Sequence, residues 1–314
     1  MNWIKNFLKP KIKSLFRKKS SMKDAPELWS TCECKQLIYR EDLFKNLSVC
    51  PNCGSHHKID ARSRFSIFFD HSQFEILPTP LSRLDDPLNF RAKKKYSDQI
   101  KDARRKTNQS DSILVAFGKL NGMEVTCAAM SFDFIGGSLS QNSGEAFIAG
   151  ISRAIEFKTP FVIFTASGGA RMQENLMSLV QMSRTVLAVS ELKKANLPYF
   201  VVMTNPTAGG VTASFAGLGD IAIAEPGATV AFAGARVIKD TVKEELPPNF
   251  QLSSWVLEHG GLDMVVERKY LRGTISILLQ ILLKKKEQTI LETELETDDV
   301  ESQINPKTSK SQSA

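Results

Sequence analysis

The stretch PFVIFTASGGARMQE, residues 160–174, joins an apolar run to Gly168-Gly169 and then to a helical pattern. A second apolar run, PYFVVMT over residues 198–204, is also followed by a glycine pair, Gly209-Gly210. Near-continuous apolar runs of this length are typical of strands that are buried on both faces of a parallel sheet, beneath crossover helices. The two copies therefore predict an α/β fold built from repeated units.

An earlier copy of the same unit is more polar. SFDFI, residues 131–135, predicts its strand and is followed by Gly136-Gly137, so the three glycine pairs stand 32 and 41 residues apart. Before this copy, residues 113–117 and 123–130 flank an Asn-Gly turn and predict a β-hairpin. The helices expected after the three glycine pairs span residues 143–157, 170–195 and 211–218.

The expected middle helix, residues 170–195, is amphipathic. Apolar and small residues recur along it with the period of an α-helix, which predicts one face packed against the core. The methionines of this helix are interpreted as packing residues rather than as contacts for a cofactor. The predicted core face comprises Met172, Leu176, Leu179, Val180, Ser183, Val186, Leu187 and Ser190.

Four of the five cysteines lie within 22 positions and predict a C4-type zinc ribbon. Cys50-Pro51-Asn52-Cys53-Gly54 is a CxxC knuckle of the kind that supplies half of a tetrahedral zinc site. Cys32-Glu33-Cys34 is one residue shorter than usual, so His56 or His57 could replace one thiolate, and a ribbon without zinc is the alternative. Four thiolates would close the coordination sphere, which indicates a structural metal. Clustered thiols without an export signal favour the reducing cytoplasm.

A glycine pair between a strand and a helix can serve chemistry through its backbone. Glycines let a ligand approach closely, and amides at a helix start are unpaired donors with partial positive charge. Such a turn can hold a phosphate, or an oxyanion that develops on the carbonyl of an acyl thioester; the alternative is a tight turn that binds nothing. Motifs of phosphate loops, dinucleotide-binding loops and hydrolase elbows are absent from the sequence. Ser167 and Ser214 lie near glycine pairs, but His259 is the only candidate base of the main body, which disfavours a serine triad.

Two long motifs follow the cysteine ribbon: SGGARMQE at residues 167–174 and PTAGGVTASFA at residues 206–216. Shorter segments accompany them: Trp29, LIY at residues 37–39, IAEP at 223–226, FAGARVI at 232–238 and LPP at 246–248. Together these motifs resemble the β subunits of bacterial acetyl-CoA carboxylase carboxyltransferases. The resemblance covers about residues 28–283, most of the chain.

The resemblance implies a crotonase-like (ClpP/crotonase) fold, a spiral of β-β-α units, which suits the repeat. It implies transfer of a carboxyl group from carboxybiotin to acetyl-CoA, giving malonyl-CoA for fatty acid synthesis, and a structural Zn²⁺ in the ribbon. The implied partners are an α subunit in an α2β2 assembly, the biotin carboxyl carrier protein and biotin carboxylase. Biotin itself is implied to take the proton of acetyl-CoA after losing CO2, in accord with a body that offers few acids or bases near the glycines.

Site residues also follow from the resemblance. The amides of Gly209 and Gly210 are the implied catalytic groups, which would stabilise the enolate of acetyl-CoA. The implied substrate-binding residues, which would shape the CoA pocket, are Gly136, Gly137, Gly168, Gly169, Ala170 and Arg171. A crotonase-type hydratase or isomerase is the rival enzyme class. Such an enzyme needs carboxylates over the acyl chain, and Glu174 is the only acid close to a glycine pair.

The formal charge of +7 is unevenly placed. Residues 1–20 carry seven lysines and arginines and no acid, and residues 287–314 carry a net charge of −5, so residues 21–286 carry +5. A positive body suits the polyanionic CoA, with Lys93–Lys95, Arg104 and Arg171 as candidates for phosphate contacts. The basic arm could be solvated, or could contact a membrane surface or nucleic acid as a secondary activity.

Composition and motifs divide the chain into four expected parts. They are a basic arm (1–24), the C4-type zinc ribbon (25–60), the carboxyltransferase domain (61–286) and a disordered acidic tail (287–314). The tail is expected to be disordered because it has few apolar residues to bury. No apolar run reaches the roughly 18 residues that a membrane span needs, so no stable membrane insertion is expected.

Overall fold

The computed structural model describes residues 28–82, 84–243 and 245–283. The basic arm (1–24) and the acidic tail (287–314) lie outside these residues, and the expectations for them stay predictions. The chain separates into two compact units, Met1–Gly54 and Ser55–Ala314. The first unit holds the cysteine cluster and the second holds all three glycine pairs.

The first unit is a small ribbon. β1 (Trp29–Thr31) pairs antiparallel with β2 (Leu37–Tyr39), and α1 (Arg40–Lys45) follows. Between the two strands the chain reverses at Lys35, which has a left-handed φ of 65°. In the described part of this unit the buried cluster has four residues, Cys32, Ile38, Leu43 and Cys50. So few buried side chains give little hydrophobic stabilisation, and ribbons of this size usually depend on a metal.

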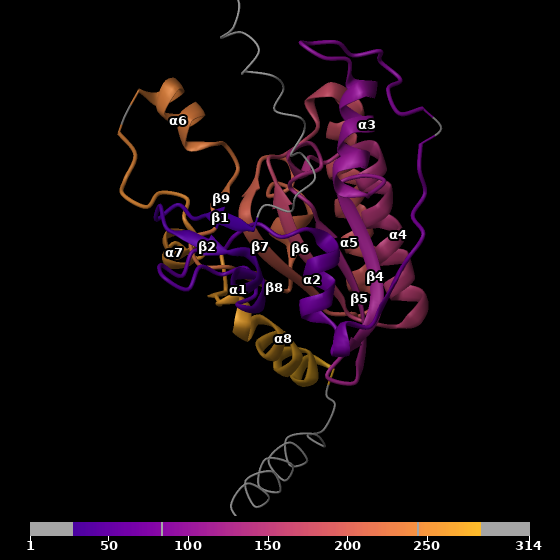
Figure 1. Ribbon diagram of the computed structural model, residues 1–314. Coiled ribbons are helices and arrows are strands. Elements are labelled where there is room, and N and C mark those ends of the chain that lie inside the picture. Colours follow the sequence, from indigo (N-terminus) through magenta and orange to yellow (C-terminus); the bar gives the residue numbers. More distant parts are fainter. Residues whose placement is uncertain (1–27, 83, 244, 284–314) are drawn as a thin grey trace, which may run out of the picture. The chain divides into compact units, whose positions relative to one another are not determined.

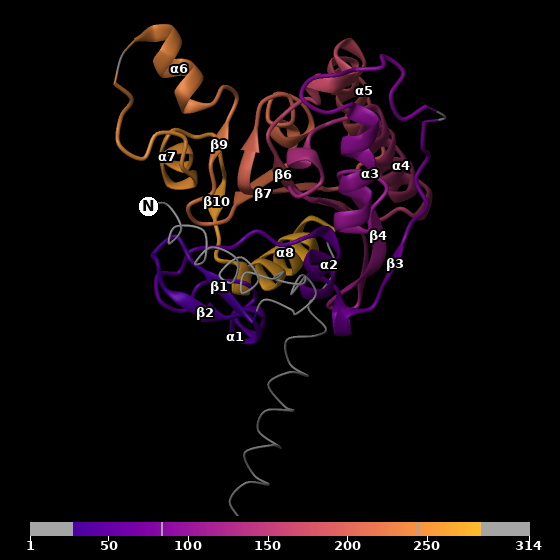
Figure 2. The same ribbon diagram turned by 45° about the horizontal axis from the view of Figure 1, so that its top comes forward.

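The second unit contains a mixed sheet. Its strands are β3 (Phe74–Ile76), β4 (Ile113–Leu120), β5 (Met123–Met130), β6 (Phe161–Ser167), β7 (Tyr199–Ala208), β8 (Ile221–Ala224), β9 (Val230–Ala231) and β10 (Met264–Val265). The strand order is β10-β8-β7-β6-β5-β4-β3, and β9 pairs with β7 (Figures 1 and 2). β4 and β5 form the expected antiparallel hairpin, whereas β5 to β8 run parallel. The predicted strands at 160–165 and 198–204 are therefore confirmed as β6 and β7.

Helices cover both faces of this sheet (Figure 2). α4 (Gln141–Phe157) and α5 (Leu176–Lys194) pack on one face, and α2 (Ala61–Phe68) and α8 (Arg268–Leu282) pack on the other. Successive strand residues enter the two clusters alternately, as a doubly covered sheet requires. The other helices are α3 (Tyr96–Thr107), α6 (Ala235–Val242) and α7 (Ser253–Glu258). Among the described residues no helix has the length and apolar character to cross a membrane.

Two expectations for the repeat are wrong. Residues 131–135 form no strand, because the strand of the first unit is β5 and the chain after it turns into a short 3-10 helix, Ile135–Gly137. The backbone amide of Phe134 bonds to Ser131 O at 3.1 Å, which closes that turn. Residues 211–218 form no α-helix either; turns lead into a 3-10 helix, Phe215–Leu218. The glycine and β-branched residues of this segment have low helix propensity, which fits its irregular backbone.

The predicted core face of the middle helix is also wrong, because α5 presents that face to the outside. Leu176 and Leu187 are each 66% exposed. The buried face instead begins with three polar residues, Ser178, Gln181 and Thr185, and continues with Ala188, Val189 and Leu192. This face lets α5 approach α4 closely: a Cβ on Gly144 of α4 would lie 2.4 Å from Gln181 Oε1. The buried hydroxyls bond to the backbone of α5 itself, as Thr185 Oγ1 does to Gln181 O at 2.9 Å.

Candidate active site and metal centre

The first two glycine turns lie against each other at the carboxyl ends of β5 and β6. The amide of Gly168 donates to Gly136 O at 2.9 Å. A Cβ on Gly137 would lie only 1.8 Å from Ala166 O, so this position admits no larger residue without a shift of the backbone. The turns that the sequence places 32 residues apart are therefore in direct contact.

The third turn touches the second. A Cβ on Gly209 would lie 2.9 Å from Gly169 Cα and 3.3 Å from Gly168 O. Gly209 also has a left-handed φ of 64°, which an L-residue adopts only with strain. The structure thus brings five of the implied site residues together, namely Gly136, Gly137, Gly168, Gly169 and Gly209, and Ala170 and Gly210 follow directly in the chain.

The backbone donors of these turns differ in availability. The Gly209 amide donates to Ala231 O and Phe232 O, both at 3.0 Å, and the Gly169 amide donates to Ser167 Oγ at 3.0 Å. The amides of Ala170 and Gly210 have no hydrogen-bond partner among the described residues. A Cβ on Gly210 would lie 3.5 Å from Ala170 N, so these two amides are neighbours. Among the described residues, the Ala170 and Gly210 amides are therefore the neighbouring pair still open to a ligand oxygen, and the implied role of the Gly209 and Gly210 amides stays a prediction.

Arg171 lies in the interior. Its side chain is 0% exposed, and its guanidinium forms a bidentate pair with Asp111 at 2.7 and 2.9 Å. Burial acts to lower the pKa of Arg171, but Asp111 outweighs burial and holds the pKa above its ordinary value. The expected contact of this side chain with a CoA phosphate does not fit this geometry. The other cations proposed for phosphates are partly engaged: Arg104 is paired with Asp85 at 2.6 Å, and Lys94 with Asp102.

Three polar side chains that the sequence analysis considered, Ser214, His259 and Glu174, also form local hydrogen bonds. Ser214 Oγ donates to Gly210 O at 2.6 Å, and His259 Nδ1 lies 2.7 Å from Trp255 O. Glu174 is buried, and its Oε2 accepts from the Gln141 amide at 2.6 Å. Neither Ser167 nor Ser214 is hydrogen-bonded to a histidine in the described part of the chain, so no serine–histidine pair is seen there.

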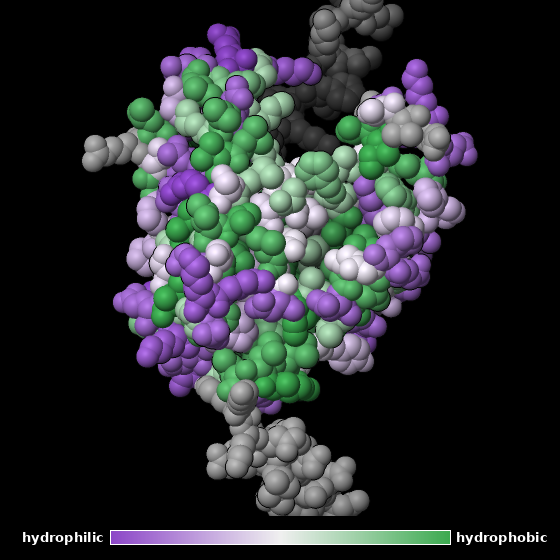
Figure 3. All heavy atoms as spheres, turned by 180° about the vertical axis from the view of Figure 1, so that it is seen from behind, coloured by the Kyte–Doolittle hydropathy of each residue, from purple (hydrophilic) through white to green (hydrophobic). Residues whose placement is uncertain are grey.

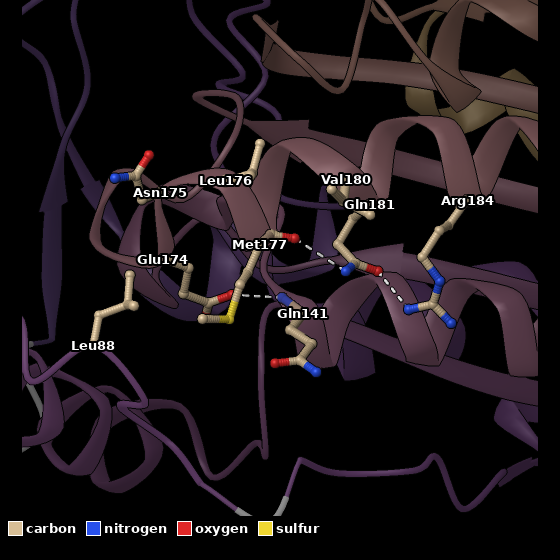
Figure 4. Close-up of a pocket in the computed structure, with 9 residues that line it drawn as sticks. All are labelled: Leu88, Gln141, Glu174, Asn175, Leu176, Met177, Val180, Gln181 and Arg184. Atoms are coloured by element: carbon tan, nitrogen blue, oxygen red, sulfur yellow. Dashed lines mark hydrogen bonds between the residues drawn. The ribbon is translucent and has the colours of Figure 1, made fainter.

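A cavity of about 450 Å³ opens beside α5 and was not foreseen from the sequence (Figure 4). Its walls combine apolar side chains with amides and one buried carboxylate. In Figure 4 the Glu174 carboxylate accepts a hydrogen bond from the backbone amide of Gln141, and both residues line this cavity. The lining residues are Leu88, Gln141, Glu174, Asn175, Leu176, Met177, Val180, Gln181 and Arg184. Leu88 comes from a segment more than 50 residues away in sequence, so no local motif could have indicated the cavity.

In the ribbon, the four cysteine sulfurs lie within 4.8 Å of one another. The Sγ atoms of Cys32 and Cys53 are 3.6 Å apart, and those of Cys34 and Cys50 are 3.9 Å apart. Burial acts to raise the pKa of Cys50, but the backbone amides of Cys53 and Asn52 outweigh it and lower the pKa to about 7. The short CxC spacing therefore still delivers two thiols. A set of four converging thiols fits tetrahedral zinc, with no need for a histidine ligand.

Comparisons with known proteins agree with both parts of this geometry. Residues 29–53 match the family described as acetyl-CoA carboxylase zinc finger domain, and residues 86–293 match the carboxyl transferase domain family. The acetyl-coenzyme A carboxylase carboxyl transferase subunit beta of Pelagibacter ubique is 51% identical over 288 residues, which cover 91% of this chain and 93% of that protein. The chain belongs to the family of acetyl-CoA carboxylase carboxyl transferase β subunits.

Other relatives and solved structures extend this finding. The β subunit of Brucella abortus is 48% identical, with 91% of this chain and 94% of that protein covered. Transcarboxylase 12S matches with a TM-score of 0.58 and 22% identity over 77% of this chain and 43% of that chain. A Pseudomonas malonate decarboxylase hetero-dimer matches with a TM-score of 0.54 and 21% identity over 77% of this chain and 95% of that chain. The crotonase-like carboxyltransferase fold is thus confirmed, and as a β subunit the chain is part of a multi-subunit biotin-dependent carboxyltransferase.

Proposed function

We propose that this chain supplies the acetyl-CoA half of the carboxyltransferase reaction, in which acetyl-CoA becomes malonyl-CoA. Carboxybiotin, carried by a separate carrier protein, would supply the carboxyl group. The observation that supports the role of this chain is the pair of neighbouring backbone amides, Ala170 and Gly210, with no partner among the described residues. Together they would form an oxyanion site of two backbone donors between adjacent turns.

The chemical step needs what these amides offer. Removing a proton from the acetyl methyl group moves negative charge onto the thioester oxygen. Two N–H donors fixed at that oxygen would stabilise the enolate without a nucleophilic side chain. The Gly209 amide, which already donates to Ala231 O and Phe232 O, would shape the turn rather than bind substrate. Gly136, Gly137, Gly168 and Gly169 would keep the three turns in contact and leave the backbone open to CoA.

The zinc would have a separate, structural role. We assign Cys32, Cys34, Cys50 and Cys53 as its ligands, because their sulfurs converge and two of the four contribute to the ribbon's small core. Four thiolates leave no open coordination position for a substrate. None of the five cysteines of this chain forms a disulfide, which supports a reducing cytoplasm as its compartment.

The partners would be an α subunit, in an α2β2 assembly, together with the biotin carboxyl carrier protein and biotin carboxylase. The outward apolar face of α5 supports a large protein partner, because exposed apolar patches of this kind mark interaction sites. Seen from behind, apolar and polar side chains are interspersed over the visible face (Figure 3), and the exposed apolar residues of α5 are Leu176, Leu179, Val180, Val186 and Leu187. We propose that the α subunit covers this face.

The deciding experiment is co-expression with a candidate α subunit, followed by an assay of malonyl-CoA formation from acetyl-CoA and carboxybiotin. Gly210→Pro removes the proposed donor, whereas Gly210→Ala keeps it: its Cβ would crowd only the flexible end of Met182, at 2.9 Å, and would meet Ala170 at ordinary van der Waals distances of 3.4 and 3.5 Å. Loss of one oxyanion donor should lower kcat about 10²- to 10³-fold in the proline variant, and much less in the alanine variant. Equal activity of the two variants would remove Gly210 from the site. Hydration of an enoyl-CoA by the chain alone would favour the rival hydratase class.

A further inference from the structure

The guanidinium of Arg171 uses every one of its donors inside the protein. An arginine side chain has five N–H groups in a fixed planar fork. Nε donates to Ser138 Oγ at 2.9 Å, and one terminal nitrogen donates to Asp111 and to Ser138 O at 2.7 and 3.0 Å. The other terminal nitrogen donates to Asp111 and to Tyr96 Oη at 2.9 and 3.2 Å. No donor is left for a ligand.

A second buried charge, Glu174, continues this network three residues later. Its Oε1 accepts from the Tyr96 hydroxyl, and its Oε2 accepts from the Gln141 amide at the start of α4. Tyr96 thus bridges Arg171 and Glu174, since its hydroxyl accepts from one and donates to the other. The tyrosine itself comes from the start of α3 and is 1% exposed.

The hydrogen bonds of Arg171 join the two chain segments that follow the first two glycine turns. Ser138 comes directly after Gly136-Gly137, and Arg171 comes two residues after Gly169. The backbones of the two segments are also paired: the Leu139 amide donates to Gly169 O at 2.9 Å, and the Arg171 amide donates to Leu139 O at 2.8 Å. The Arg171 guanidinium also bonds to Ser138, so it holds the residue next to this backbone pairing at Leu139.

The pairing at Leu139 decides where the Ala170 amide points. Gly169 O and Ala170 N belong to one planar trans peptide, in which the C=O and the N–H point in opposite directions. Because Gly169 O is bonded to Leu139, the Ala170 N–H is directed away from Leu139 and stays free of partners among the described residues. Any rotation of Ser138 and Leu139 would turn this peptide and with it the Ala170 donor.

We propose that Arg171, Asp111, Tyr96 and Glu174 form a positioning cluster that aims the Ala170 amide at the thioester oxygen. This inference rests on the proposed function of Ala170. The side chains of the cluster are buried and bonded to one another, so we assign its members as positioning residues rather than catalytic ones. A guanidinium is needed because only a planar fork can hold the Asp111 carboxylate and both oxygens of Ser138 together.

The gentlest test is Tyr96→Phe in the full chain assembled with the α subunit. The variant removes the bridging hydroxyl but leaves the Arg171–Asp111 pair intact, so no new unpaired charge is created. We expect kcat to fall about tenfold, as for other small misplacements of reacting groups, with the KM for acetyl-CoA and the midpoint of thermal unfolding close to those of the native chain. Tyr270→Phe is the matched control, since Tyr270 is 58% exposed and lies outside the cluster.

A merely structural role would give a different pattern. Unchanged kcat in Tyr96→Phe would overturn the proposal, and so would a loss of activity that only follows a loss of folded protein. Arg171→Lys keeps the charge but not the fork, so it should lower kcat at least as much as Tyr96→Phe. Native kcat in the Arg171→Lys variant would also overturn the proposal.

A readout without catalysis separates this proposal from the proposed function. Amide hydrogen exchange should become faster at residues 136–142 and 168–174 in Arg171→Lys, with the exchange of β7 unchanged. If the native assembly makes no malonyl-CoA, the proposed function fails while this measurement still reports on the cluster. Native exchange rates at both segments in the variant would show that the cluster does not hold the turns, and would overturn the inference.

Discussion

Gly209 and Gly122 offer a matched pair of substitutions that separates backbone strain from contact between the glycine turns. Both residues are left-handed, with φ values of 64° and 75°. Alanine at either position should therefore cost a similar free energy, roughly 1–2 kcal/mol. The two sites differ in their surroundings: a Cβ on Gly122 would meet nothing within 4 Å, whereas a Cβ on Gly209 would lie 2.9 Å from Gly169 Cα.

The size of the catalytic effect follows from this contact. Ordinary van der Waals contact begins at 3.4 Å, and the partner atom belongs to the backbone, so it cannot swing aside as a flexible side chain would. One turn must move by about half an ångström, which is the tolerance within which catalytic groups have to be held. We expect kcat of Gly209→Ala to fall about tenfold, equivalent to about 1.4 kcal/mol of transition-state stabilisation.

The assay compares both variants, assembled with the α subunit, by malonyl-CoA formation and by thermal unfolding. Gly122→Ala should lose stability but keep the native kcat, because its hairpin turn is remote in the sheet from the carboxyl ends of β6 and β7. Gly209→Ala should lose both. If the two variants lose stability equally and neither loses kcat, the contact between the second and third turns has no part in catalysis.

Three further predictions concern the ribbon, α5 and the buried charges. Metal analysis should find one zinc per chain in the native protein and none in Cys50→Ser, whose ribbon should unfold. Full zinc content in this variant would contradict the assignment of ligands. Leu187→Glu should leave the unfolding midpoint of the isolated chain unchanged, because this side chain is 66% exposed, but should weaken assembly with the α subunit in analytical ultracentrifugation. Burial acts to raise the pKa of Glu225, but Arg64 and Arg268 hold it well below 4.5, so the free energy of unfolding should fall as pH drops below about 4.5. Glu225→Gln should lack this acid dependence in pH-dependent unfolding curves, and an identical dependence in both proteins would refute the role of Glu225.

The strands, the ribbon and the glycine pairs could be predicted because each has a local signature. β6 and β7 are continuous apolar runs that need burial on both faces, and the CxxC knuckle carries its own geometry. The position of Arg171 could not be predicted in this way. Its partners Asp111 and Tyr96 lie 60 and 75 residues earlier in the chain, so only the folded sheet brings them together.

The hydrogen bonds of the Gly209 amide could not be predicted, for a similar reason. Gly209 and Gly210 are adjacent and look equivalent in the sequence, yet β9 supplies carbonyl acceptors to the first and not to the second. Pairing with a two-residue strand leaves almost no sequence signal. The useful signal was the charged residue in the motif itself: an arginine two residues after a glycine pair, at the end of a buried strand, demands a buried acid or a ligand anion.

The reversed orientation of α5 shows how a periodic pattern can be correct about a helix and wrong about its environment. Apolar spacing establishes that one face avoids water, but not whether the core or another protein covers it. Where α4 approaches closely at Gly144, the inner face of α5 carries polar residues that bond to its own backbone, Gln181 and Thr185, and buried apolar residues follow further along the helix at Val189 and Leu192. Leu176, Leu179 and Leu187 face outward, where they would lower the solubility of a chain that worked alone. A helix with its apolar face outward is what a subunit of a multi-subunit enzyme needs, and this is why α5 is where we expect the α subunit to bind.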